Sequence, residues 1–420
     1  METDYDALIV GASIEGLCVA NYLALNGKKV AIVELMPIKK MGNEDKCALL
    51  SGKTIEILKE FFQIRIPSKF IENEFESFSI DFGGKREVIQ SESYLVNEKM
   101  LIYYLVGKII ELENVSFFEK SEFTELLFDN KRIIGAKIKS ENIEQLKAKI
   151  IIDASGSKSA VRMSLKENAY FSKFPDESKI FPYYEELVEN SDFQGLSFMF
   201  EPEKKDVGFF SVIPKSEGKA IMRLNVFDKL IDPEKYFKEF KEKNFSNCKT
   251  LKSTLGKYLI SNPFYGFCYQ NVLLLGSSAF QNNPFLKEDF SLKMNACVSI
   301  CKELMNVFSI NEIYTNDLWG YNASFMRKHG HKLQLFEKAK DLLFDLSSDE
   351  IEYLIDSEKL KELINSAFSG INKASLISLI FKPRLIAKIM KHADKFNKIK
   401  EAFSKYPEYD DFVIWKNGLK

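Results

Sequence analysis

The residues best suited to chemistry in this sequence form a glycine-containing turn near its beginning. Residues 6–16 read as an apolar strand, a turn that contains Gly11, Ala12 and Ser13, and a helix that begins near Gly16. Gly11 permits a tight turn, Gly16 lets the helix pack closely on the strand, and the free N–H groups at the helix start favour a pyrophosphate. Ser13 adds a small side chain at the tightest point. The pattern predicts a dinucleotide site, with an ordinary strand-to-helix turn as the alternative.

An acidic residue, Glu34, supports the first interpretation. It closes the next apolar strand, residues 29–34, which follows a helix that ends near Asn26 and Gly27. Strand, helix and strand in this order require a parallel sheet with the helix as the crossover. An acid at the end of the second strand can accept hydrogen bonds from a ribose. We therefore predict a Rossmann-type dinucleotide fold.

Two later turns have a shape that returns the chain to the same nucleotide. Residues 150–156 form an apolar strand that ends in Asp153 and leads through small residues and Gly156 to a helix start. Residues 271–279 form another apolar strand, which ends in Gly276 and Ser277. We expect both turns to lie near the nucleotide. The alternative for each is a plain strand-to-helix turn.

The composition excludes several classes of protein. The chain has 420 residues, with 60 acidic and 59 basic side chains, so its net charge of −1 gives no indication of nucleic-acid binding. Six scattered cysteines and three histidines lack the spacing of metal ligands, which predicts a reduced, cytoplasmic protein without a metal site. The acidic N-terminus does not resemble a signal peptide. No apolar run approaches the roughly 18–20 residues that cross a bilayer.

The order of the expected elements predicts an α/β fold with an inserted antiparallel sheet and a helical C-terminal region. We assign residues 1–165 and 264–330 to one discontinuous dinucleotide-binding domain. Residues 166–263, with strands from about 70–95, are expected to form a substrate-binding sheet domain. Residues 331–420 look helical, with Pro383 as the main break. A sheet laid against a nucleotide domain leaves a cleft, and clefts between domains are common substrate sites.

This arrangement resembles the geranylgeranyl reductase family, within the flavoproteins related to p-hydroxybenzoate hydroxylase. Besides the turns above, Cys47 matches a cysteine that follows the second strand in many members. Residues 208–215 look like the family's aromatic-rich strand that ends in Phe-Pro-Lys, and residues 321–355 are similar to its helical extension. The resemblance covers almost the whole chain.

The resemblance implies that FAD is bound and that hydride passes to carbon–carbon double bonds of an isoprenoid chain. The protein would position the alkene against the flavin and exclude oxygen and water. The sequence does not identify the electron donor or the proton donor. Cys47 is a candidate catalytic residue, and the alternative is that it is only a small residue of the core. The candidate residues are Gly11, Ala12, Ser13, Gly16, Glu34, Asp153, Gly156, Gly276, Ser277 and Pro284 for the cofactor, Phe209, Ser211, Ile213 and Pro214 for the substrate, and Cys47 for catalysis.

Several residues depart from the family pattern. Ser277 replaces a carboxylate that binds the ribityl chain, and Glu98 replaces an arginine. Residues 287–289, Lys-Glu-Asp, replace glycines beside the flavin ring, where side chains take up space and carboxylates disfavour an anionic reduced flavin. Ser211 stands where the family has tryptophan, which predicts a wider tunnel. Two alternatives to the reductase follow: a degenerate relative that has lost FAD and binds a lipid or a protein partner, and, more weakly, an FAD monooxygenase.

Residues 382–405 have the pattern of a basic amphipathic helix. They contain eight lysines and arginines against two acids. Such a helix can rest on anionic lipid, which would suit a lipid substrate and predicts peripheral membrane contact. The alternative is a helix that packs its apolar face on the protein. The interleaved apolar residues are Leu385, Ile386, Ile389, Phe396, Ile399 and Phe403.

Overall fold

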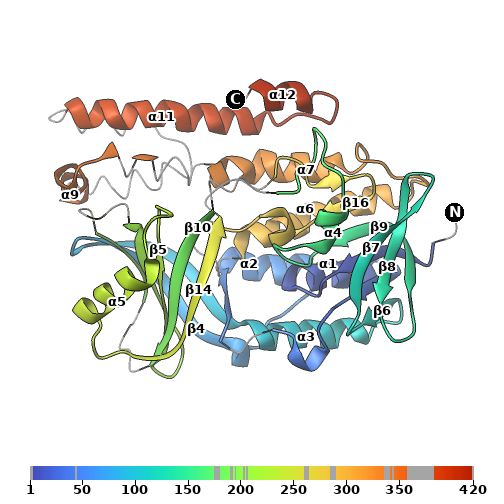
Figure 1. Ribbon diagram of the computed structural model, residues 1–420, viewed down its shortest axis with the longest axis horizontal. Coiled ribbons are helices and arrows are strands. Elements are labelled where there is room, and N and C mark those ends of the chain that lie inside the picture. Colours follow the sequence, from blue (N-terminus) through green and yellow to red (C-terminus); the bar gives the residue numbers. More distant parts are fainter. Residues whose placement is uncertain are drawn as a thin grey trace.

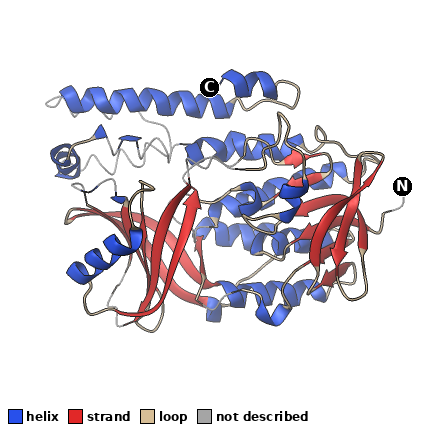
Figure 2. Ribbon diagram, in the orientation of Figure 1, coloured by secondary structure: helices blue, strands red, loops and turns tan. Residues whose placement is uncertain are grey.

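The computed structural model (Figure 1) describes residues 3–42, 45–174, 180–189, 193, 195–201, 204, 207–259, 264–283, 290–334, 341–342, 345–356 and 383–418. Within these residues the strands form two sheets of eight strands each. Figure 2 shows the sheets at opposite ends of the view, with most of the helices between and above them. The predicted fold class, an α/β protein with a second, largely antiparallel sheet and a helical C-terminal region, is confirmed.

The first sheet brings the predicted nucleotide-binding turns to one edge. It consists of β1 (Tyr5–Val10), β2 (Val30–Val33), β6 (Val115–Phe118), β7 (Glu122–Asp129), β8 (Arg132–Lys139), β9 (Gln145–Asp153), β15 (Cys268–Tyr269) and β16 (Val272–Leu274). The main order is β15-β16-β9-β1-β2-β6, and all neighbours after β16 are parallel. Asp153 pairs with Val10 on one side and Leu274 on the other. The turns after β1, β9 and β16 therefore meet.

Helix α1 (Ile14–Leu25) begins and ends where local signals predict. The Ser13 side chain caps its start by accepting a hydrogen bond from the Gly16 N–H at 3.2 Å. Serine is among the residues preferred at this position. The helix ends at Asn26, and Gly27 follows with a φ of +74°, which glycine adopts readily. The crossover from β1 to β2 thus matches the sequence pattern closely.

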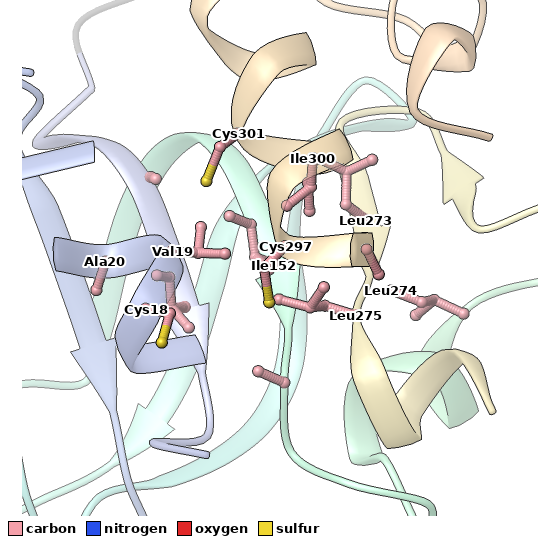
Figure 3. Close-up of a cluster of buried hydrophobic side chains, with 14 of the residues drawn as sticks. Cys18, Val19, Ala20, Ile152, Leu273, Leu274, Leu275, Cys297, Ile300 and Cys301 are labelled. Carbon is pink, nitrogen blue, oxygen red and sulfur yellow. The ribbon is translucent and has the colours of Figure 1, made fainter. Parts of the chain in front are cut away.

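Helices α3 (Glu98–Ile110) and α6 (Ser291–Val307) pack against α1, and small side chains fill the contact between α1 and α6. Figure 3 shows this contact above β9 and the end of β16. Cys18, Cys297 and Cys301 are fully buried there, and burial raises the pKa of each thiol. All three are small core residues.

The second sheet lies beside the first and is covered on one face by helix α5 (Pro233–Asn244). Phe237 of α5 lies with its ring centroid 5.0 Å from those of both Tyr184 and Phe210. The strand order is β14-β10-β13-β12-β11-β4-β5-β3, and only the β4–β11 pair is parallel among the pairs described. The strands are β3 (Cys47–Ser51), β4 (Ile71–Phe82), β5 (Lys85–Asn97), β10 (Ile180–Glu189), β11 (Leu196–Phe200), β12 (Phe209–Pro214), β13 (Ala220–Asn225) and β14 (Lys249–Leu259).

The C-terminal region is helical where it is described. Its helices include α9 (Ser348–Asp356), α11 (Pro383–Ser404) and α12 (Phe412–Gly418), and α7 (Trp319–Phe325) precedes the region. Pro383 is the first residue of α11, where its missing N–H removes no helical hydrogen bond. In Figure 1, α11 runs along the top of the molecule, over the second sheet and the central helices.

The apolar face of α11 packs on the protein. Leu385 and Ile389 join a core cluster with Phe82 of β4 and Leu354 of α9, and Phe403 joins the main core. Of the side chains expected to enter lipid, Leu385, Ile389, Phe396 and Phe403 are buried in the protein. Membrane contact through residues 382–405 stays a prediction. No helix among the described residues is both long enough and apolar enough to span a bilayer.

Candidate active site

A cavity of about 740 Å³ lies between the carboxyl edge of the first sheet and one face of the second sheet. Its volume falls within the range of about 300–1,000 Å³ that is typical of ligand sites. The turns after β1 and β9 border it at one end, and strands β10, β13 and β14 border it at the other. Among the predicted residues, those that line it are Gly11, Ala12, Ser13, Glu34, Cys47, Gly156 and Ser277.

The turn after β1 leaves no room for side chains. Gly11 has a φ of +94°, and a Cβ added there would lie 2.6 Å from Ser155 Cα. A Cβ added at Gly16 would lie 2.7 Å from the Gly11 carbonyl oxygen and 2.9 Å from the Ala154 side chain. Non-bonded heavy atoms do not approach this closely without displacement. The two glycines therefore allow the close approach of the β1 turn, helix α1 and the β9 turn.

Glu34 is held in the cavity wall by backbone N–H groups. One carboxylate oxygen accepts a hydrogen bond from Ala12 N, and the other accepts one from Met36 N, both at 2.8 Å. Each oxygen has further acceptor capacity, because an ionised carboxylate offers about four lone-pair positions. The carboxylate is thus oriented at the end of β2, where a ribose hydroxyl could donate to it.

Asp153 lies behind the cavity wall rather than in it. The residue is fully buried, and its carboxylate accepts hydrogen bonds from Ser155 N at 3.1 Å, from Ser278 Oγ at 3.0 Å and from the Ser159 hydroxyl. These bonds tie the turn after β9 to the turn after β16. Gly156, with a φ of +91°, is the part of this turn that borders the cavity. Direct contact between Asp153 and a cofactor stays a prediction.

The turn after β16 presents a hydroxyl to the cavity. Gly276 has a φ of +64°, and Ser277 donates a hydrogen bond from Oγ to Asn282 Oδ1 at 3.0 Å. Both Ser277 and Asn282 line the cavity. Pro284 and residues 287–289, which the sequence singled out, lie outside the described residues.

Sequence reasoning missed an ion pair in the cavity wall. Lys293 Nζ lies 2.9 Å from Glu15 Oε1, and the two side chains are only 9% and 5% exposed. Burial, the largest single influence, would raise the pKa of Glu15, but the ammonium of Lys293 and the hydrogen bonds to the carboxylate together outweigh it and hold the pKa below its ordinary value. Both residues line the cavity. Glu15 stands inside the predicted turn, but nothing local in the sequence points to its partner.

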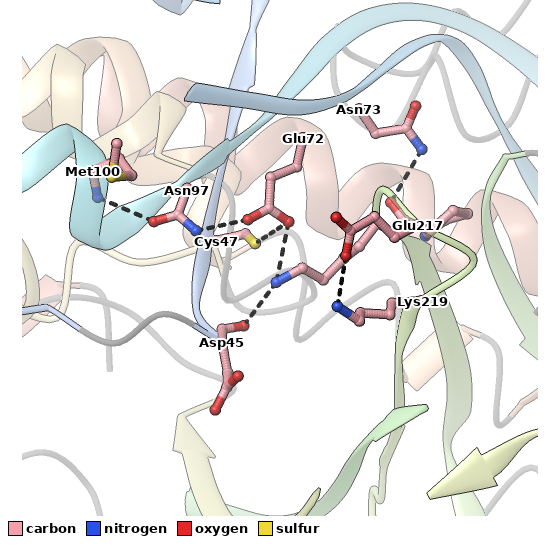
Figure 4. A network of polar contacts seen from close by, with 10 residues as sticks. Asp45, Cys47, Glu72, Asn73, Asn97, Met100, Glu217 and Lys219 are labelled. Atoms are coloured by element: carbon pink, nitrogen blue, oxygen red, sulfur yellow. Dashed lines mark hydrogen bonds and ion pairs between the residues drawn. The ribbon is translucent and has the colours of Figure 1, made fainter. Parts of the chain in front are cut away.

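Cys47 borders the cavity from β3, and Figure 4 shows its contacts. Its Sγ donates to Glu72 Oε2 at 3.6 Å, and Lys215 Nζ lies 3.1 Å from the same oxygen. Asn97 donates to the other oxygen of Glu72 at 2.7 Å. Burial raises the pKa of Cys47 to about 12, and the Lys215 ammonium only partly opposes this. The thiol therefore keeps its proton at neutral pH and is a poor nucleophile.

The opposite end of the cavity carries a second charged pair that the sequence did not reveal. Arg223 of β13 donates from Nε to Glu185 of β10 at 2.8 Å, and its guanidinium carbon lies 5.3 Å from the ring centroid of Tyr183. Ser211 pairs directly with Arg223 in the sheet, so the two side chains share one face. A polar row, rather than an aromatic one, therefore crosses this face.

The four predicted substrate residues do not border the cavity. Phe209, Ser211, Ile213 and Pro214 all lie on β12 and are buried. The neighbouring strands β10 and β13 instead supply the lining residues Tyr183, Glu185, Ile221, Arg223 and Asn225. Substrate contact by the β12 residues, and the wider tunnel expected at Ser211, stay predictions.

The dinucleotide end fits FAD. Glycines at positions 11 and 16 form a cradle that a Cβ would fill, and the N-terminus of α1 faces it, as a pyrophosphate requires. Glu34 offers an oriented acceptor for the ribose. The cavity then continues past Ser277 and the pair of Glu15 with Lys293 toward the second sheet. No group of His, Cys, Asp and Glu that could hold a metal occurs among the described residues.

Comparisons with known proteins agree with this geometry. The sequence is 21% identical to a digeranylgeranylglycerophospholipid reductase of Sulfolobus acidocaldarius, over 97% of this chain and 94% of the relative. It is 24% identical to digeranylgeranylglycerophospholipid reductase 1 of Methanopyrus kandleri, over 87% of this chain and 97% of the relative. The fold is similar to the crystal structure of a geranylgeranyl bacteriochlorophyll reductase-like protein from Thermoplasma acidophilum, with a TM-score of 0.73, 19% identity and 99% of each chain covered.

A family model described as an FAD binding domain matches residues 4–229, which is more than half of the chain. The match begins just before β1 and extends beyond β13, so it includes the cradle, Glu34 and most of the second sheet. The protein therefore belongs to the FAD binding domain family of flavoproteins, and its cofactor is FAD.

Proposed function

We propose that this protein is an FAD-dependent oxidoreductase that reduces carbon–carbon double bonds in the isoprenoid chain of a lipid. The observation that carries the proposal is the cavity that borders both the dinucleotide turns and the face of the second sheet. Such a cavity can hold a cofactor and a substrate in contact. Two relatives that match most of the chain are named digeranylgeranylglycerophospholipid reductases, which supports the choice of substrate.

The chain's own residues would bind and shield the reactants. When bound and reduced, FAD would supply the hydride for the double bond. The first turn of α1 would hold the pyrophosphate and Glu34 the ribose. Tyr183, Ile221 and Tyr258 line the far end and offer aromatic and aliphatic surface to a hydrocarbon chain. The walls contributed by both sheets would keep water and oxygen from the reacting atoms.

Cys47 is the proposed proton-bearing group in this cavity. Its raised pKa, about 12, keeps the proton on sulfur, and Glu72 with Lys215 holds the side chain in place. Reduction of an alkene needs one proton for each hydride, so a protonated group next to the substrate has a use. A small residue at the edge of the core is the alternative role for Cys47.

The experiment uses the intact protein reconstituted with FAD. We expect a yellow protein whose flavin, once reduced by dithionite without oxygen, is reoxidised by a geranylgeranylated phospholipid. Mass spectrometry should then show the gain of two hydrogens for each double bond reduced. Reduced protein that leaves geranylgeranylated lipids and shorter prenyl compounds unaltered would contradict the proposal.

The same experiment separates the two alternatives. A protein that stays colourless after reconstitution would be a relative that has lost FAD, although family membership and the intact cradle favour the enzyme. A reduced flavin that reacts with oxygen and hydroxylates a bound ligand, while the alkene stays unaltered, would indicate a monooxygenase.

A further inference from the structure

The ion pair between Glu15 and Lys293 occupies a position where three elements meet. Glu15 lies in the first turn of α1 and Lys293 in the first turn of α6. The turn that begins with Gly276 lies against the Glu15 side chain and contacts α6. Lys293 Nζ also lies 4.2 Å from the centroid of the Phe290 ring. The pair is therefore fixed from several sides, and it forms part of the cavity wall between the dinucleotide cradle and the second sheet.

The pair places a carboxylate at the turn after β16, although Ser277 carries none. A Cβ added at Gly276 would lie 2.9 Å from Glu15 Oε1, so the carboxylate lies directly against this turn. The adjacent Ser277 offers only a hydroxyl, which already donates to Asn282. The resemblance described above implies a carboxylate at position 277. Here a carboxylate reaches the same turn from a different helix.

The buried charges of Glu15 and Lys293 favour a polar ligand beside the pair. Removing a carboxylate and an ammonium from water is costly, and one contact between them rarely recovers that cost. Glu15 also stands at the helix N-terminus that binds pyrophosphate, where a further uncompensated negative charge would repel it. Lys293 has three N–H donors, and Glu15 is its ion-pair partner among the residues described. Within the described part of the chain, its other donors are therefore available to acceptor oxygens of a molecule in the cavity.

We propose that Glu15 and Lys293 together anchor the central, hydroxyl- and phosphate-bearing part of FAD, in place of a carboxylate at position 277. The carboxylate accepts hydrogen bonds from hydroxyl groups, and the ammonium donates to an acceptor oxygen and cancels the charge of Glu15. The inference rests on FAD as the cofactor and is independent of the substrate. On this proposal, the FAD site keeps its function with a carboxylate supplied from α1 instead of from position 277.

The first test measures FAD affinity of the apoprotein by quenching of flavin fluorescence, with thermal unfolding of the apoprotein as the second measurement. Lys293→Met leaves Glu15 uncompensated, and we expect FAD affinity to fall at least about tenfold. The double variant Glu15→Gln/Lys293→Met removes both charges, so the apoprotein should regain stability while FAD affinity stays at least about tenfold below that of the wild type. A purely structural pair predicts instead that the double variant regains wild-type affinity, which would overturn the proposal.

The second test moves the carboxylate. Glu15→Ala should weaken FAD binding, and Glu15→Ala combined with Ser277→Asp should recover most of the loss. Ser277→Asp alone adds a like charge beside Glu15 and should lower affinity. If Ser277→Asp alone raises affinity and the double variant gains nothing further, position 277 is merely decayed and the proposal is wrong.

A matched control is the buried pair of Lys241 with Glu186, whose side chains are 13% and 5% exposed and lie away from the cavity, at the face under α5. Lys241→Met/Glu186→Gln should leave FAD affinity unchanged. If the wild-type protein itself binds no FAD, the cofactor assignment fails, and this result is distinct from every outcome above.

Discussion

The two ends of the cavity are built by different means. At the dinucleotide end, the turn after β1, the start of α1 and Glu34 all belong to one β-α-β unit. Backbone N–H groups and glycines form most of the cofactor site there. At the far end, the wall consists of side chains from separate strands, such as Arg223 with Glu185.

This difference between the two ends shows where in the sequence cofactor recognition and substrate recognition are encoded. A backbone cradle depends on a few glycines, so a single added methyl group can destroy it. A wall of paired side chains can change when two strands change together. The pairing of Ser211 with Arg223 and of Arg223 with Glu185 is such a case, because a small residue on β12 stands next to a large charged one on β13. Cofactor recognition is therefore local in the sequence, whereas substrate recognition is distributed.

The largest effect should follow from a methyl group in the cradle. Gly11→Ala places a Cβ 2.6 Å from Ser155 Cα and 2.7 Å from the Ala154 carbonyl oxygen at a φ of +94°. We expect loss of FAD binding, seen as a colourless protein, and a decrease of about 2–4 kcal/mol in the free energy of unfolding.

Gly27→Ala is the control, because its φ is also positive, at +74°, and no atom lies within 4 Å of the added Cβ. It should cost only about 1 kcal/mol in stability and keep the yellow colour. Equal FAD binding by the two variants would show that the cradle is not the cofactor site.

The sequence predicts the locally encoded end well. The turn with Gly11 and Gly16, the break at Asn26 and Gly27, and the apolar runs on either side define β1, α1 and β2 to within a residue or two. All of these signals act over a few residues. The hydrogen bond from Ser278 to Asp153 is not predicted by the sequence, because the two residues are remote from each other in the chain.

The far end is predicted less well for physical reasons. Strands β10 and β14 were expected only as part of a strand-rich segment, because polar residues such as Glu185 on the cavity face obscure the alternation. The Lys293 contact with Glu15 joins two helices that only the folded chain brings together. The apolar stripe of α11 was clear, but a pattern alone does not say whether lipid or protein covers it.

The next largest effect concerns the paired wall. Arg223→Met leaves the partly buried Glu185 carboxylate without its guanidinium partner, and we expect the free energy of unfolding in denaturant to fall by about 1–3 kcal/mol. The double variant Arg223→Met/Glu185→Gln should recover most of that loss. FAD affinity should stay near the wild-type value in both, because neither residue belongs to the dinucleotide end. A large loss of FAD affinity in the double variant would contradict the division between the ends.

A smaller effect is expected from Glu34→Gln. The amide keeps the size of the side chain but replaces a charged acceptor with a neutral one, both for Ala12 N and for a ribose hydroxyl. FAD affinity, followed by flavin fluorescence, should fall about tenfold. Glu60→Gln, in an exposed pair with Lys59 on the surface, is the control and should have no effect. An unchanged affinity in Glu34→Gln would show that the ribose binds elsewhere.

The smallest effect concerns the reactivity of Cys47, which borders the cavity from the edge strand of the second sheet. Burial and the negative charge of Glu72 raise the pKa of this thiol, whereas Lys215 lowers it. Iodoacetamide should therefore label Cys47 very slowly at pH 8, with a rate that rises as the pH approaches 12. Glu72→Gln removes the charge that disfavours the thiolate and leaves Lys215 in place, so labelling at pH 8 should become about threefold to tenfold faster. Lys215→Met should instead make labelling slower than in the wild type. The Cys47→Ser variant serves to identify the labelled peptide by mass spectrometry. Equal changes in both variants would show that access, and not charge, controls the thiol, because opening the edge strand would speed labelling whichever side chain is lost.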